Sequence, residues 1–301
     1  MSRRRTAVAG QFYPGNESSL IRKIEDAFKD ETFGPGRLPE LKNKEKRTII
    51  GGTAPHAGYD YSAPAAAWTY LNIFEEKMPD TVIILGTDHV GYNKIALMDK
   101  GAWDTPIGEL EIDSEVADRI LSNSDIIIAD DSAFIGFPFG REHNIEVQLP
   151  FIKYFAKQKD VKIIPIKLTT KNFGKLDKIA TDLASSMKEL DQDIIIIASS
   201  DMTHKQPRNP SNPQQDLEQM RKQDQAVINA FKEFDPKKTL EYAQKTSVCG
   251  PQTITTLMLT CKKLGGTRTK PLTYYTSYEK MGGQGPCDYS VGYFSGIILT
   301  D

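Results

Sequence analysis

Residues 193–204 read Asp-Ile-Ile-Ile-Ile-Ala-Ser-Ser-Asp-Met-Thr-His, and this stretch decides the fold class. Four consecutive isoleucines cannot alternate between core and solvent, so the run predicts a strand buried on both faces, as in a parallel sheet covered by helices. The run ends in small residues, the carboxylate of Asp201 and the imidazole of His204. Because ligands of open α/β sheets bind beyond the carboxyl ends of the strands, we expect both side chains beside a binding crevice.

Two earlier apolar runs repeat this arrangement. Residues 48–55 lead into His56, and residues 81–88 lead into His89. In both places a glycine and a tyrosine follow the histidine after one intervening residue. The chain has only four histidines, and three of them follow such runs. The sequence therefore predicts one pocket at the edge of a sheet that collects His56, His89 and His204.

The rest of the chain fits a single α/β domain over residues 1–301, with a largely parallel or mixed central sheet flanked by helices. Apolar spacings of three and four predict the helices, and the lengths between strands fit βαβ crossovers. Helices are expected at residues 17–30, 63–78 (with Ser62 as N-cap), 112–120, 173–190, 217–234 and 237–246, around 141–152 with Pro150 as a kink or restart, and from Pro251 onward. Further strands are expected at 94–98, 126–129, 161–168, 272–278 and 289–299, and loops at 101–108 and 205–215.

Composition narrows the function classes. The chain of 301 residues has 26% charged residues and a formal net charge of -2. Its overall charge therefore creates no positive electrostatic potential that would attract nucleic acid or an anionic membrane. No apolar run reaches the roughly 18 residues that a membrane-spanning helix needs. Three cysteines are too few and too scattered for a disulfide framework. We expect a cytoplasmic protein that binds neither nucleic acid nor a membrane.

His56, His89 and Cys249 are candidate metal ligands. Imidazole is the commonest ligand of borderline ions, and a thiolate completes sites that prefer softer ions. Because both histidines end separate strands, a sheet can bring them to one rim. Cys249 lies just ahead of a helix start, where unpaired amides and the helix dipole lower the pKa of a thiol and favour the thiolate. The alternatives are packed or solvated histidines without an ion, and a cysteine that acts as a small buried hydrophobe.

Asp201 and His204 are candidate acid–base residues, because a spacing of three suits a pair that transfers or orients a proton. The alternative is a carboxylate that caps a turn beside a solvated imidazole. Of the other two cysteines, Cys261 lies on an apolar helical stripe and is expected in the core. Cys287 lies in a glycine-rich loop, and the sequence leaves its role open.

A second set of residues is expected to support the site. His143 has Glu142 beside it and Glu146 nearby, and the two glutamates are four residues apart, so they share one face of a predicted helix. An ordinary solvated helix face is the alternative. Asp88 and Tyr59 lie next to the strand-end histidines and are candidates for the pocket wall, with capping of the following turn as the alternative for Asp88.

Six motifs follow one another along the chain: Val8–Pro14, Pro55–Tyr59, Gly86–His89, Glu142–Glu146, Ser199–His204 and Cys249–Gly250. Their identity and order resemble those of the Memo family, in particular its prokaryotic and archaeal members. The resemblance spans essentially the whole chain. It implies a relation to the catalytic subunit of class III extradiol dioxygenases, which are non-haem iron enzymes that open catechol rings.

The resemblance also implies where a metal site lies. The family's metal ligands match His56, His89 and Cys249, and His204 occupies the place of the dioxygenases' acid–base histidine. The dioxygenases bind iron through two histidines and one carboxylate, whereas the third position here is a cysteine. A thiolate admits copper as well as iron, so the resemblance supports a metal site better than it supports ring cleavage.

Three hypotheses follow. The first is a redox protein that holds iron or copper, with Asp201 and His204 handling protons. The second is a non-enzymatic binding or adaptor protein that keeps the pocket for a small molecule or peptide. Its pathway partners, implied by the resemblance, are a radical-SAM protein and a small third protein. The third, which the sequence favours least, is zinc-dependent hydrolysis with His204 or Asp201 as the general base.

Overall fold

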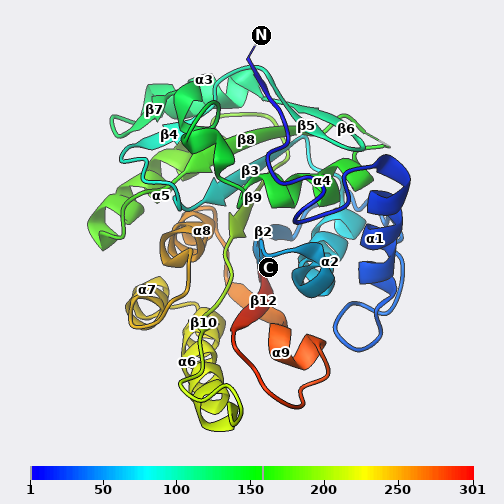
Figure 1. The fold of residues 1–301 in the computed structure, drawn as a ribbon. Helices are drawn as coiled ribbons and strands as arrows, with labels where there is room; N and C mark the ends of the chain where they lie inside the picture. The colour runs from blue at the N-terminus through cyan, green and yellow to red at the C-terminus, as the bar shows by residue number, and fades with distance from the viewer. Residues whose placement is uncertain (1, 158) are drawn as a thin grey trace.

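The computed structural model describes residues 2–157 and 159–301. Its centre is four parallel strands in the order β2 (Ile49–Ala54), β9 (Ile194–Ser199), β3 (Thr81–Gly86) and β8 (Lys162–Lys167). Every residue of β9 is buried, because helices lie on both sides of the sheet (Figure 1). The prediction that the isoleucine run forms a doubly covered strand is confirmed.

Antiparallel strands extend this centre, so the nine-stranded sheet is mixed. On one side β12 (Ser290–Leu299) runs antiparallel to β2, and on the other β4 (Ile95–Leu97) runs antiparallel to β8. β10 (His204–Lys205) and β11 (Arg268–Thr276) both pair with β12, and β7 (Ile127–Ala129) pairs with β4. The strands expected from the sequence are therefore present, with shifted ends.

Two adjacent glycines of β2 show how closely helices approach the sheet. A Cβ atom on Gly51 would lie 3.2 Å from Sγ of Cys261 in α8 (Pro251–Lys263). A Cβ atom on Gly52 would lie 2.7 Å from Cγ2 of Thr69 in α2 (Tyr59–Glu76). Because successive residues of a strand point to opposite faces, α8 and α2 cover opposite faces of the sheet. Cys261 is a core residue, as predicted.

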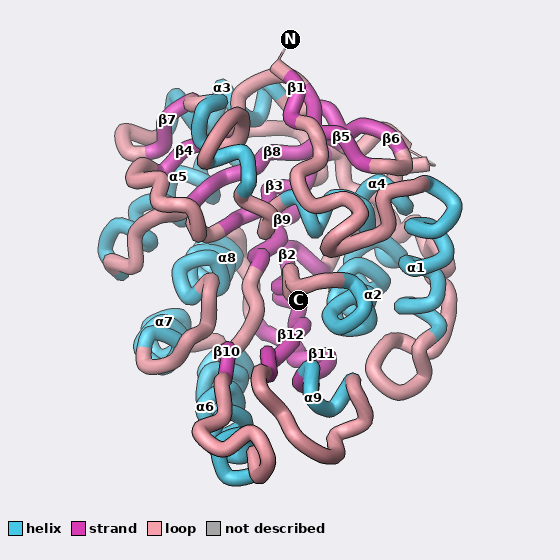
Figure 2. Tube along the Cα trace, in the orientation of Figure 1, coloured by secondary structure: helices cyan, strands magenta, loops and turns pink. Residues whose placement is uncertain are grey.

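The remaining helices extend these two layers. Figures 1 and 2 show α1 (Glu17–Lys29) beside α2, and α7 (Pro236–Gln244) beside α8. The others are α3 (Ser114–Asn123), α4 (Leu149–Phe155), α5 (Phe173–Lys188), α6 (Gln214–Lys232) and α9 (Ser277–Lys280). None of the described helices combines the length and the apolar character that crossing a membrane requires.

Two predictions of secondary structure are wrong. The helix expected at residues 63–78 begins at Tyr59 with Gly58 as its N-cap, and the Ser62 hydroxyl instead donates to the carbonyl oxygen of Ala57 at 2.7 Å. Residues 101–108 are not a loop, because β5 (Ala102–Thr105) and β6 (Gly108–Glu111) form a hairpin that pairs with β1 (Arg3–Arg4). The loop prediction failed because β1, the strand that pairs with β5, lies about 100 residues earlier in the chain, and local sequence patterns cannot indicate so distant a partner.

The helix expected around residues 141–152 forms only in its second half. The first half contains two 3-10 turns, η2 (Phe139–Arg141) and η3 (Glu146–Gln148), before α4 begins with Pro150 in its first turn. Glu142 follows η2 as its C-cap residue and belongs to neither turn. The prediction that Glu142 and Glu146 share a helical face is therefore wrong, and their side chains have different partners.

Glu146 forms a buried ion pair with Arg4. Nη1 of Arg4 lies 2.5 Å from Oε2 of Glu146, and the two side chains are 3% and 0% exposed. The remaining hydrogen bonds go from Ala7 N, Val8 N and the Tyr13 hydroxyl to the carboxylate, and from the guanidinium to the carbonyl oxygens of Phe134, Gly140 and Glu142. The pair therefore ties the start of the chain to the segment that carries Glu142 and His143.

We expect Arg4→Met to lower the free energy of unfolding by about 3–5 kcal/mol, because it leaves the Glu146 carboxylate buried without its cation. The adjacent Arg3 is the matched control. Its side chain is 58% exposed in a surface pair with Asp104, so Arg3→Met should cost less than about 1 kcal/mol. Urea unfolding of both variants measures the difference, and equal losses would contradict the structural role of the buried pair.

Candidate metal centre

All four histidines of the chain gather at the ends of the central strands. His56 follows β2, His89 follows β3, His204 opens β10 after β9, and His143 lies between η2 and η3. The ring centroids of His56, His89 and His143 are 5.5 to 5.8 Å apart. Nε2 of His204 lies 3.9 Å from Oδ2 of Asp201, which in turn is 4.0 Å from Nε2 of His56. The tertiary structure thus brings together four imidazoles and the carboxylate of Asp201.

The hydrogen bonds around Ser199 fix the tautomer of His56. The Ser199 hydroxyl donates its single hydrogen to the carbonyl oxygen of Asn144 at 2.7 Å. Its oxygen must therefore accept from Nδ1 of His56 at 2.9 Å and from the side-chain amide of Gln148 at 2.8 Å. Nδ1 of His56 carries the hydrogen, and Nε2 keeps a free lone pair. Such a fixed tautomer is what a metal-binding imidazole requires.

Glu142 does the same for His89. Its carboxylate accepts from the backbone N–H of His89 at 2.6 Å and from Nδ1 at 3.0 Å, so in the neutral ring the lone pair of His89 is on Nε2. Burial alone would lower the pKa of His89, but the hydrogen bond and the charge of Glu142 outweigh it and raise that pKa. Burial would raise the pKa of Glu142, whereas the contacts with His89 hold it at about 2.

Cys249 directly contacts His56. Its Sγ lies 3.1 Å from Nε2 of His56 and accepts a hydrogen bond from the backbone N–H of Asp201 at 3.2 Å. Pro251 begins α8, as predicted. The expected lowering of the thiol pKa is wrong for the ion-free chain, because burial, followed by the charge of Asp201, raises the pKa of Cys249. A bound cation would reverse this, since a coordinating thiol loses its proton.

Nε2 of His204 and Oδ2 of Asp201 are 3.9 Å apart, which is beyond direct hydrogen-bond range. A proton that passes between them would need a bridging water or ligand. Burial raises the pKa of Asp201 to about 7, although its Oδ1 accepts hydrogen bonds from the backbone N–H groups of His56 and Ala57. Burial, followed by the charge of a protonated His89, lowers the pKa of His204 to about 4. Nδ1 of His204 lies 2.6 Å from the Tyr289 hydroxyl, and its Nε2 is buried without a hydrogen-bond partner.

His143 lies closer to the cluster than the sequence predicted. Its ring stacks on that of His89 with an interplanar angle of 17°, and on its other side the ring of Phe12 is 4.5 Å away between centroids. Burial lowers the pKa of His143 and so favours the neutral imidazole. His143 follows no strand, so the strand-end pattern that singled out the other three histidines predicted only a supporting role for it.

Two groups of three side chains place their donor atoms within 4.8 Å of one another. One is His56, His89 and His143, and the other is His56, Asp201 and Cys249. The combination predicted from the sequence takes His89 from the first group and Cys249 from the second. His56 is the member that both groups share.

Three other predicted site residues have structural contacts instead. The Tyr59 hydroxyl is buried and donates to the carbonyl oxygen of Val147 at 2.7 Å, and Glu146 pairs with Arg4. Asp88 accepts from the backbone N–H of Gly91 at 2.8 Å, the turn-capping role considered for it, and pairs with the buried Lys167 at 3.3 Å. Cys287 packs in a small separate apolar cluster with Leu217, Met220 and Tyr278.

Sequence reasoning missed several residues that orient the site, namely Asn144, Gln148, Ser199 and Tyr289. Ser199 and Asn144 belong to motifs already recognised, so their place in those motifs was an available signal. Gln148 and Tyr289 were not detectable, because Gln148 reaches Ser199, and Tyr289 reaches His204, from distant parts of the chain.

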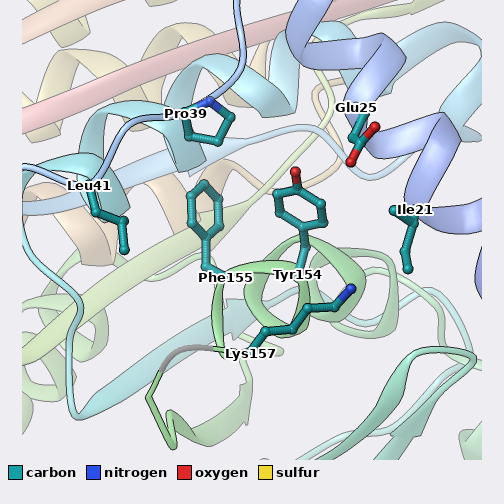
Figure 3. A pocket seen from close by; sticks show the side chains of 7 residues that line it. All are labelled: Ile21, Glu25, Pro39, Leu41, Tyr154, Phe155 and Lys157. Carbon is teal, nitrogen blue, oxygen red and sulfur yellow. The ribbon is translucent and has the colours of Figure 1, made fainter.

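A separate hollow lies between α1, α4 and residues 39–41 (Figure 3). Its lining is Ile21, Glu25, Pro39, Leu41, Tyr154, Phe155 and Lys157. It contains none of the histidines or cysteines, and its single carboxylate faces the Tyr154 hydroxyl. We therefore place the candidate functional site at the histidine cluster.

Comparisons with known proteins point to one family. A family model described as Memo-like protein matches residues 4–297. A MEMO1 family protein of Desulfurococcus amylolyticus is 40% identical over 97% of this chain and 98% of the relative, and one of Methanobrevibacter smithii is 34% identical over 98% and 99%. Among solved structures, uncharacterized protein JW3007 from Escherichia coli K12 matches with a TM-score of 0.43 and 9% identity, over 82% of this chain and 99% of that chain.

The raised pKa of Asp201 predicts a specific pH dependence of stability in metal-free protein. In the unfolded chain Asp201 loses its proton near pH 3.8, whereas the folded chain keeps that proton up to about pH 7. The folded state binds more protons in this window, so the contribution of Asp201 to the free energy of unfolding is complete below pH 3.8 and is lost as the pH rises through 7.

Asp201→Asn removes this titration. Relative to the wild type, the variant should gain stability with rising pH between about 4 and 7, by at most about 1.4 kcal/mol per pH unit. Urea unfolding at several pH values in the presence of a chelator measures the difference. Parallel stability curves for the two proteins would show that Asp201 titrates normally.

Proposed function

The chain belongs to the Memo family, as its six ordered motifs indicate, and we propose that it is a metal-binding protein whose histidine cluster holds a redox-active ion, iron or copper. The observation that carries the proposal is the Nε2 lone pair of His56, which is fixed by Ser199 and lies 3.1 Å from Sγ of Cys249. A lone pair held in this way beside a thiol and further imidazoles fits a cation better than it fits a packed core.

In this proposal His56, His89 and Cys249 are the ligands. Glu142 and Ser199 orient the two imidazoles, as carboxylates and hydroxyls commonly do around metal-bound histidines. A bound iron or copper ion would supply electron transfer and Lewis acidity. A thiolate ligand admits copper and iron as well as zinc. Zinc hydrolysis stays the less favoured hypothesis because nothing in the sequence resembles a hydrolase motif. Ring cleavage is not part of the proposal, because the third ligand is not a carboxylate.

Asp201 and His204 would handle protons in this site. A carboxyl group with a pKa near 7 can hold or release a proton at neutral pH, and a neutral His204 can take one up at Nε2. Nδ1 of His204 contacts the hydroxyl of Tyr289, whose side chain belongs to a residue that is 56% exposed. Tyr289, His204 and Asp201 would therefore form a proton route from solvent toward the cluster once a water or ligand bridges the 3.9 Å between Nε2 of His204 and Oδ2 of Asp201.

A second proposal, from a different class, is a non-enzymatic adaptor. The exposed ring of Tyr289 beside His204 favours it, because an aromatic face at the rim gives a small molecule or peptide a surface for stacking. The proposed radical-SAM and small protein partners rest on the family resemblance, and the cytoplasmic location rests on composition. Binding of a peptide or partner that survives His56→Ala would favour this adaptor role.

We expect protein purified without oxygen to contain iron or copper, and His56→Ala and Cys249→Ser each to lose most of it, because each removes a ligand. Elemental analysis measures the metal content, and a visible absorption band on exposure to air would identify a thiolate-bound oxidised ion. Cys287→Ser is the control, since Cys287 packs in a separate apolar cluster and should retain the metal. Unchanged metal content in both His56→Ala and Cys249→Ser would contradict the proposal.

A further inference from the structure

A buried lysine lies beside the strand end that leads to His89. Lys167 is the last residue of β8, and in the parallel pair of β8 and β3 it lies opposite Gly86, the last residue of β3. Its side chain is 0% exposed. Because an ammonium group loses its hydration on burial, a fully buried lysine is rare and needs partners that replace the water. The neighbours of Lys167 therefore indicate what the residue does.

Asp88 supplies the opposite charge. Its Oδ1 lies 3.3 Å from Nζ of Lys167, and its side chain is 9% exposed. Apart from this pair, neither atom has a hydrogen-bond partner among residues 2–157 and 159–301. Oδ2 of Asp88 accepts from the backbone N–H of Gly91 at 2.8 Å. Because Asp88 directly precedes His89, the ion pair fixes the turn that carries this histidine to the end of β8.

Three aromatic rings lie around the ammonium group. Nζ of the lysine is 5.3 Å from the ring centroid of Tyr92, 5.7 Å from that of Phe134 and 5.8 Å from that of Phe139. The rings of Tyr92 and Phe139 also meet edge to face, with centroids 5.1 Å apart. An ammonium group within about 6 Å of a ring centroid is attracted by the ring, so these rings replace part of the lost hydration.

The rings come from the two segments that meet at His89. Tyr92 belongs to the turn after His89, whereas Phe134 and Phe139 precede Glu142 in the chain. Glu142 accepts hydrogen bonds from the backbone N–H of His89 at 2.6 Å and from its Nδ1 at 3.0 Å. The ammonium group thus contacts both segments whose closeness these two hydrogen bonds require.

We propose that Lys167 is a positioning residue of the histidine cluster: its ion pair with Asp88 holds His89 in place. The hydrogen bonds from His89 to Glu142 depend on this position. The inference rests on the proposed function, because it takes His89 as a member of the functional site. The position of His89 is nevertheless measurable without an ion, so the inference and the proposed metal binding are tested separately.

Substitution separates the charge of Lys167 from its bulk. Methionine is flexible and packs well against aromatic rings, but it carries no charge. Lys167→Met therefore fills the space among the rings and leaves the Asp88 carboxylate buried without its cation, which is a costly arrangement. Adding Asp88→Asn removes the unpaired charge, so the double variant should recover what Lys167→Met loses. A residue that only fills space would show no such recovery.

Amide hydrogen exchange of ion-free protein, followed by NMR, measures the effect at His89, whose N–H donates to Glu142. This N–H should exchange at least ~10-fold faster in Lys167→Met than in the wild type. In Lys167→Met/Asp88→Asn its rate should return to within about threefold of the wild type. The first change reports a looser contact between His89 and Glu142, and the second reports its repair.

Two controls separate positioning from a general loss of stability. The backbone N–H of His56 donates to Oδ1 of Asp201 at 2.8 Å, elsewhere in the same cluster. Its exchange should stay within about threefold of the wild type in every variant. Lys162→Met, at the exposed start of β8, should change the exchange of neither histidine.

Unchanged exchange at His89 in Lys167→Met would overturn the inference. So would equal acceleration at His56 and His89, a double variant that exchanges as fast as Lys167→Met, or a double variant that does not fold. Should Lys167→Met alone fail to fold, Asp88→Asn gives the test from the other side, because it leaves the ammonium group without a counter-charge and should accelerate exchange at His89. The proposed metal binding is judged instead by the metal content of His56→Ala and Cys249→Ser.

Discussion

Burial of the central strands on both faces is the constraint on which the rest of the structure depends. A strand covered by helices on both sides has no solvated face for polar side chains, so β2, β3 and β9 carry almost none until they end. Because these strands are parallel, their carboxyl ends emerge at one edge of the sheet. The polar residues that follow the strands are thereby gathered in one place, among them His56, His89, Asp201 and His204.

A cluster of buried polar groups is stable only if their hydrogen bonds are satisfied, and here that requirement also sets the chemistry. The one hydrogen of Ser199 goes to a carbonyl oxygen, which obliges His56 to donate from Nδ1. Glu142 imposes the same tautomer on His89. In the neutral form of each ring, Nε2 is consequently the nitrogen that keeps a lone pair.

The N-terminal segment acts on this site from a distance in sequence. Arg4 and Glu146 fix the backbone on either side of Glu142 and His143, and Phe12 packs on the ring of His143. The motif Val8–Pro14 contributes no donor atom of its own to the cluster among the described residues. Its place in the family pattern is explained by packing and by hydrogen bonds that hold the segment carrying Glu142 and His143.

The sequence by itself determined the doubly covered strands, the flanking helices, the family, and the strand-end histidines with Cys249, since apolar runs and ordered motifs are local signals. It predicted only a supporting role for His143 and not its stacking on His89, because the position of an irregular segment depends on tertiary packing. It also misjudged Glu146, Tyr59 and the hairpin at residues 102–111, whose partners lie far along the chain. Only the tertiary structure decided which donors meet at His56 and which nitrogen is free, because distances between side chains and hydrogen-bond directions exist only after distant segments have packed.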